Sequence, residues 1–122
     1  MRSAAAERYD ALLRDVAFVA PPPVSLPGLN ISWFVYVIRL APHVDRERVQ
    51  TVMSEQGIGT GRYFPPIHLQ PAWRSVAGAS DVCLPVTESI ARRTLALPFF
   101  NRITESQQEE VIAILRSAIG KT

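Results

Sequence analysis

The segment Ile31–Leu40, ISWFVYVIRL, has the pattern of a β-strand that is apolar on both faces. Most of its residues are β-branched or aromatic, and such residues favour strands. Side chains alternate along a strand, so one face would hold Trp33, Val35 and Val37, and the other Phe34, Tyr36, Ile38 and Leu40. We therefore expect a central strand that is covered on both sides.

Apolar periodicity and capping residues predict the remaining elements. Helices are predicted over residues 4–14, 46–56, 71–75, 85 or 87 to 93, and 105–119, and further strands over 60–64 and 94–97. Asp45 is the expected N-cap of the second helix, and Gly57 its stop. Thr104 and Gln107 have the spacing of a capping box. A proline run at 21–23 predicts an extended path, and residues 77–80 a small-residue loop.

This order of elements predicts an α/β fold of the α+β type, with a small three-stranded sheet backed by helices on one face. The sequence leaves the strand directions open. The predicted helices suffice to cover one face of the sheet, although the central strand is apolar on both. We therefore expect another domain or chain to cover the second face, and an isolated chain to self-associate, which light scattering can test.

Composition excludes several classes of function. The 122 residues fit a single domain (1–122), with 13 basic and 11 acidic residues and no basic stripe, so nucleic-acid binding is not expected. No apolar run could span a membrane and no signal peptide is visible, so the predicted compartment is the cytoplasm. Cys83 is the single cysteine, which excludes a disulfide framework, and we expect it to be buried or half-buried.

Chemically capable side chains gather in the segment Gly57–Arg74, GIGTGRYFPPIHLQPAWR. His68 is the strongest candidate for chemistry, since imidazole can donate, accept or carry charge near neutral pH. The plainer alternative is a histidine that is hydrogen-bonded inside the fold. A metal site is not predicted because no cysteine, carboxylate or second histidine lies at ligand spacing from His68. A small hydrolase ranks last, because no nucleophile elbow is present.

Four more residues of this segment have a functional and a structural interpretation. Tyr63 and Trp73 could form an apolar wall for a sugar or ring, although core packing is the better prediction for Trp73. Arg62 and Arg74 could bind phosphate or carboxylate, although solvated surface arginines are more common. The glycines at 57, 59 and 61 resemble a phosphate loop but lack the following lysine, so a helix cap and strand start are preferred.

Lys121, the single lysine, is the penultimate residue, and we expect the backbone to fray there. Pyridoxal enzymes hold their cofactor as a Schiff base to an internal lysine. A frayed end cannot hold a cofactor in a dry, shaped site. Lysine-based covalent catalysis by this chain alone is therefore not expected.

Several segments together resemble the DegT/DnrJ/StrS family of sugar aminotransferases, which are pyridoxal-phosphate enzymes that aminate nucleotide-linked keto-sugars. GIGTGRYFPPIHLQPAWR resembles the C-terminal signature of that family, and NISWFVYVIRL resembles one of its strands. RYDALLRD resembles the helix that leaves the large domain, and LPVTESIARRTLALPFFNRITESQQEEVIAIL the closing helix–strand–helix. The resemblance covers nearly the whole chain.

The resemblance implies a small C-terminal domain, with residues 1–15 as the interdomain helix and 31–122 as the domain core. His68 would then face the substrate cleft, and Tyr63 and Arg62 would be further substrate-binding residues. The resemblance also implies a missing N-terminal large domain that holds pyridoxal phosphate, a homodimer in the full-length form, and no cofactor on this chain alone. No catalytic residue is assigned.

Two functions stay open on this basis. The first is a domain of a sugar aminotransferase that supplies pocket contacts but not the Schiff-base lysine, so that the chain alone would be inactive. The second is a free-standing, non-catalytic binding or regulatory module derived from the same family.

Overall fold

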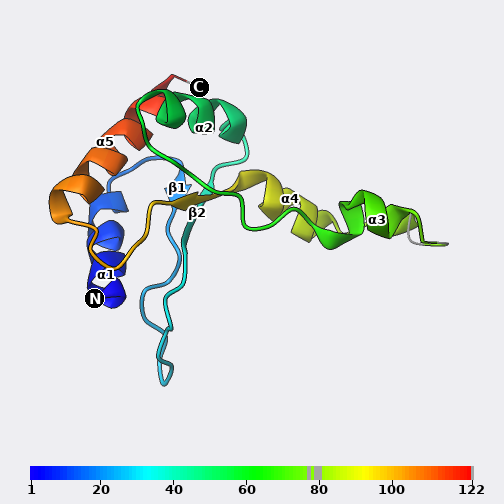
Figure 1. The fold of residues 1–122 in the computed structure, drawn as a ribbon, viewed down its shortest axis with the longest axis horizontal. Helices are drawn as coiled ribbons and strands as arrows, with labels where there is room; N and C mark the ends of the chain where they lie inside the picture. The colour runs from blue at the N-terminus through cyan, green and yellow to red at the C-terminus, as the bar shows by residue number, and fades with distance from the viewer. Residues whose placement is uncertain (77, 79–80, 122) are drawn as a thin grey trace.

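The structure, a computed structural model, describes residues 1–76, 78 and 81–121. Most of the loop expected at 77–80 therefore lies outside the described residues. Helices α1 (Arg2–Leu13), α2 (Arg46–Glu55) and α5 (Glu105–Gly120) gather with a small sheet into a body. Helices α3 (Pro71–Arg74) and α4 (Pro85–Arg93) project from this body as an arm (Figure 1).

The sheet has three antiparallel strands in the order β1 (Val19–Ala20), β2 (Tyr36–Leu40) and β3 (Thr94–Leu97). β2 is central, as predicted, and along it Tyr36, Ile38 and Leu40 are buried, Val37 is half-buried and Arg39 is exposed. The predicted three-stranded sheet with helices on one face is confirmed.

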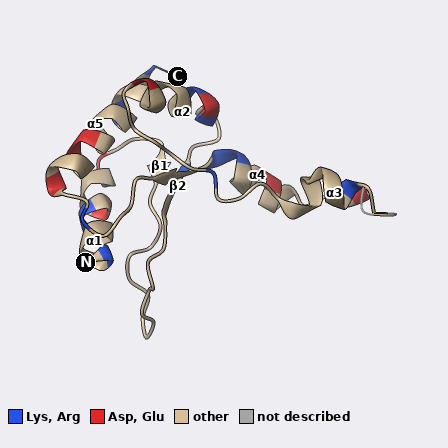
Figure 2. Cartoon of the chain, in the orientation of Figure 1, with Lys and Arg blue, Asp and Glu red and all other residues tan. Residues whose placement is uncertain are grey.

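β2 is shorter than the predicted strand Ile31–Leu40, and its partner explains why. Tyr36 pairs with Leu97, the last residue of β3. Pro98 follows, and it has no N–H to donate to a ladder. The carbonyl of Pro98 instead accepts the Tyr9 hydroxyl hydrogen at 2.7 Å. Residues 31–35 thus lie beyond the end of the sheet, in an uncharged loop that extends from the body (Figure 2).

The prediction of a strand over 60–64 was wrong. Gly61 makes one bridge to Ala96, with hydrogen bonds of 3.0 and 2.8 Å, and no strand forms around it. After Gly61 the chain leaves β3, and the Arg62 side chain bonds Gln50 of α2. The third strand is β1, whose two residues precede the proline run and pair with Leu40 and Arg39.

Local capping signals set the helix ends as predicted. Asp45 accepts the Arg48 N–H at the start of α2, at 3.2 Å. Gly57 follows α2 with a φ of +79°, which glycine adopts without strain, and Ile58 donates to the Met53 carbonyl at 2.9 Å. The capping box of Thr104 and Gln107 begins α5 with hydrogen bonds of 2.9 and 3.2 Å.

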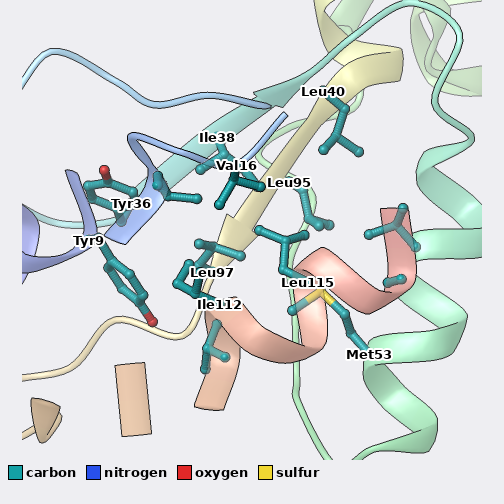
Figure 3. Packing of buried hydrophobic residues seen from close by; sticks show 14 of the residues in the cluster. Tyr9, Val16, Tyr36, Ile38, Leu40, Met53, Leu95, Leu97, Ile112 and Leu115 are labelled. Atoms are coloured by element: carbon teal, nitrogen blue, oxygen red, sulfur yellow. The ribbon is translucent and has the colours of Figure 1, made fainter. Parts of the chain in front are cut away.

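The core lies between the sheet and helices α1, α2 and α5 (Figure 3). Its largest fully buried side chains come from all of these elements: Tyr9, Leu13, Tyr36, Ile38, Leu40, Val49, Met53, Leu95 and Leu115. Tyr9 and Tyr36 pack with ring centroids 5.0 Å apart. This body fixes the base from which α4 and the preceding loop project.

The arm exposes apolar side chains, and two sequence predictions fail there. Trp73 is 44% exposed, so its predicted core packing was wrong. Cys83 is also exposed, although we expected it to be buried or half-buried. Trp73 belongs to α3 and Cys83 shortly precedes α4, on the arm that extends away from the body. Val86 of α4, and Phe64 and Ile67 in the segment that leads to α3, are more than 70% exposed.

Candidate functional site

A cavity of about 160 Å³ lies where the loop after Gly61, the start of α2 and the helix α4 meet. Its wall combines guanidinium groups, one carboxylate and apolar side chains from these elements. Arg62 and Tyr63, two of the three predicted substrate-binding residues, line this cavity, and His68 does not. This cavity is the candidate site.

Arg62 is held in place by the first turns of α2. Its Nε donates to the Gln50 Oε1 at 2.8 Å, and its Nη2 pairs with the Glu47 carboxylate. The side chain is 48% exposed, so solvent screens this ion pair. Arg62 is therefore positioned, but it still reaches the solvent and the cavity.

Tyr63 presents a half-exposed ring beside two other aromatic rings. It meets Phe34 edge-on, with centroids 6.3 Å apart, and lies 4.9 Å from the ring of Phe64. An aromatic surface with a hydroxyl at its tip suits a ligand with an apolar face and polar edges.

His68 lies behind the cavity, in the short 3₁₀ helix η1 (Ile67–Leu69), and is 7% exposed. Its Nε2 lies 2.8 Å from the Glu88 Oε1, across 20 residues of sequence. In this structure the ring is thus hydrogen-bonded inside the fold, as the plainer interpretation of the sequence had it. Its contact with the cavity is indirect, through Glu88.

Glu88 is a site residue that the sequence analysis missed. It lies in the first turn of α4, where its Oε1 accepts both His68 Nε2 and the Leu84 N–H, the latter at 3.2 Å. The hydrogen bond from His68, then that from Leu84, lowers the pKa of Glu88 below its ordinary value, and the charge of Arg92 adds to the effect. A carboxylate early in a helix was the available signal, since such acids complement the helix dipole.

Arg46 also lines the cavity without having been predicted. Its side chain is 12% exposed and bonds Glu47 at 2.8 Å and the Ala91 carbonyl. It thereby ties the start of α2 to the end of α4. Because these bonds use several N–H donors of its guanidinium group, Arg46 is better suited to support the cavity wall than to bind a ligand.

The other candidates of the central segment stay apart from this cavity. Arg74 and Trp73 are exposed on α3, and Gln70 is half-buried beside it. Within the described part of the chain, no group of three histidine, cysteine or acidic residues could hold a metal ion. The same residues include no helix that is long and apolar enough to cross a bilayer.

Lys121 lies at the C-cap of α5, is exposed, and does not line the cavity. A cofactor held as a Schiff base needs a lysine within a shaped, enclosed site. The residues of this chain therefore do not fit covalently held pyridoxal phosphate.

Solved structures share this fold over nearly the whole chain. The aminotransferase TlmJ from Streptoalloteichus hindustanus matches 98% of this chain with a TM-score of 0.84 and 30% identity. The match covers 31% of TlmJ. The fold is thus that of a domain of the aminotransferase class.

The chain belongs to the DegT/DnrJ/EryC1/StrS aminotransferase family, whose profile matches residues 1–116. It is 35% identical over 114 residues to a dTDP-4-dehydro-2,3,6-trideoxy-D-glucose 4-aminotransferase of Saccharopolyspora spinosa. It is 37% identical over 109 residues to a pleiotropic regulatory protein of Geobacillus stearothermophilus. These matches cover 93% and 88% of this chain but 28% of each relative, so the chain spans less than a third of their length.

Proposed function

We propose that this chain acts as the small C-terminal domain of a pyridoxal-phosphate-dependent aminotransferase that aminates a nucleotide-linked keto-sugar. The observation that carries the proposal is the family match over residues 1–116, together with a sugar aminotransferase of which the chain spans 28%. In this proposal residues 1–15 form the interdomain helix and 31–122 the domain core. The Schiff-base lysine, the cofactor and most of the chemistry belong to a large domain outside this chain, and the assembled protein is a dimer.

The domain's own contribution is to bind and position the sugar. Arg62 and Tyr63 contact the substrate from the cavity wall, and His68 acts from behind it. Charge and aromatic surface in one small cavity support this assignment. The apolar side chains on the arm support a partner surface, because large exposed apolar patches mark contact sites.

An NMR titration of the ¹⁵N-labelled chain tests this proposal. We expect dTDP-glucose to shift the amides of Arg62 and Tyr63 with millimolar affinity, because both residues line the cavity. Arg62→Ala and Tyr63→Ala should each weaken binding several-fold. Glu110→Gln is the matched control, since Glu110 lines a separate hollow between α5 and the loop after α2. Unchanged Arg62 and Tyr63 signals at saturating dTDP-glucose would refute the proposed sugar contacts.

A free-standing regulatory module is a second candidate, favoured by the name of the relative from Geobacillus stearothermophilus. The gene distinguishes the two. A reading frame that continues upstream into the large domain supports the aminotransferase, and a frame that is complete for this chain supports the module.

A further inference from the structure

We propose that Glu88 is a ligand-contacting residue of the cavity, whose carboxylate accepts a hydrogen bond from a sugar hydroxyl while His68 holds that carboxylate in place. This inference rests on the proposed sugar-binding function. It changes the role of His68, which becomes a positioning residue.

The two oxygens of Glu88 are unequally used. Oε1 meets His68 Nε2 at 2.8 Å and the Leu84 N–H at 3.2 Å. Oε2 has no hydrogen-bond partner among the described residues. Because the side chain is 22% exposed and lines the cavity, this second oxygen has lone pairs to offer a ligand.

Protonation states follow from the same contacts. The lowered pKa of Glu88 keeps the group ionised at neutral pH, so that it acts only as an acceptor. His68 must then carry its hydrogen on Nε2 to donate to Oε1. Because His68 is 7% exposed, its ring is better placed to orient Glu88 than to reach a ligand.

The shape and chemistry of the cavity indicate which part of a ligand it takes. Its volume of about 160 Å³ is below the roughly 300 to 1,000 Å³ of pockets that enclose drug-sized molecules. It has room for one small ring, with the nucleotide outside. Tyr63 and Phe64 supply apolar surface, Arg62 supplies donors, and Glu88 supplies the acceptor that hydroxyl groups require.

The test compares dTDP-glucose with dTDP, which lacks the sugar, in the same NMR titration. Glu88→Leu keeps the volume and removes the acceptor, so we expect about tenfold weaker binding of dTDP-glucose and unchanged binding of dTDP. Glu88→Gln keeps a neutral acceptor and the Leu84 contact. Its affinity for dTDP-glucose should fall roughly threefold, because hydrogen bonds to a charged acceptor are about twice as strong as those to a neutral one. Glu109→Gln, exposed on α5, is the charge-matched control and should bind like the parent chain.

His68→Phe tests the positioning role. It fills the buried space but leaves Oε1 with the Leu84 N–H as its one remaining donor among the described residues, so we expect the affinity for dTDP-glucose alone to fall several-fold. Ring ¹⁵N shifts of the parent chain should show the hydrogen of His68 on Nε2, and Glu88→Leu should change them. Amide spectra confirm that each variant is folded.

The outcomes separate this inference from the proposed function. Parent-like dTDP-glucose affinity in both Glu88 variants overturns the role of Glu88 while leaving the contacts of Arg62 and Tyr63 intact. If dTDP-glucose does not shift the amide signals of Arg62 and Tyr63 in the parent chain, both the proposed sugar-binding function and the proposed role of Glu88 are refuted. A His68 ring that carries no hydrogen on Nε2 refutes the positioning role alone.

Discussion

Tyr9 and Tyr36 offer a matched pair of substitutions that separates hydrogen bonding from burial. Both rings are 0% exposed and pack on each other at 5.0 Å. The Tyr9 hydroxyl donates to the Pro98 carbonyl at 2.7 Å, whereas the buried Tyr36 hydroxyl has no partner among the described residues. Replacing each by phenylalanine removes one oxygen from nearly the same apolar environment.

The two substitutions should change the free energy of unfolding in opposite directions. Tyr9→Phe loses a hydrogen bond and leaves the Pro98 carbonyl unpaired, which costs about 1 to 3 kcal/mol. Tyr36→Phe removes a desolvated, unpaired hydroxyl, so its effect should lie between zero and about 1 kcal/mol of stabilisation. For a domain of this size 1 kcal/mol shifts Tm by roughly 3 to 6 °C.

Urea unfolding followed by circular dichroism measures both free energies, with thermal unfolding as a second assay. The difference between the two variants is the most informative quantity, because both substitutions remove the same hydroxyl group from similar surroundings and differ in its hydrogen bond. If Tyr36→Phe destabilises the chain as much as Tyr9→Phe does, the Tyr36 hydroxyl has a partner in solution and the reasoning fails. Equal stability of Tyr9→Phe and the parent chain would refute the value assigned to the Tyr9 bond.

Two further predictions concern the arm and α5. The lowered pKa of Glu88 means that its stabilising contact is complete above the ordinary value of 4.5 and is lost as pH falls through the lower folded value. Amide protection in α4, measured relative to the intrinsic exchange rate at each pH, should therefore decrease below pH 4.5 in the parent chain but not in Glu88→Gln, and equal profiles would contradict this. Thr104→Ala removes the capping box and should lower the free energy of unfolding by about 1 kcal/mol in urea titrations, whereas Ser117→Ala, on the exposed side of α5, should change it little.

The candidate site combines residues that the sequence predicted with residues that it did not. Arg62 and Tyr63 were recognised as possible ligand contacts from their residue types, and the structure brings both to one cavity. Glu88 was overlooked because it lies 20 residues from His68, and no local pattern joins a carboxylate to a histidine at that distance. Arg46 was overlooked for the same reason, since its partner Ala91 lies 45 residues away on α4.

The sequence by itself determined the features that depend on a few neighbouring residues. Asp45 and Thr104 start helices because a side-chain oxygen meets an amide three residues ahead, and Gly57 ends one because it tolerates positive φ. Tertiary structure alone decided how far β2 extends, because a strand ends where its partner stops donating, and here that point is Pro98. It also decided that Trp73 is exposed, because burial depends on how far a segment lies from the packed body and not on the residue's own hydrophobicity.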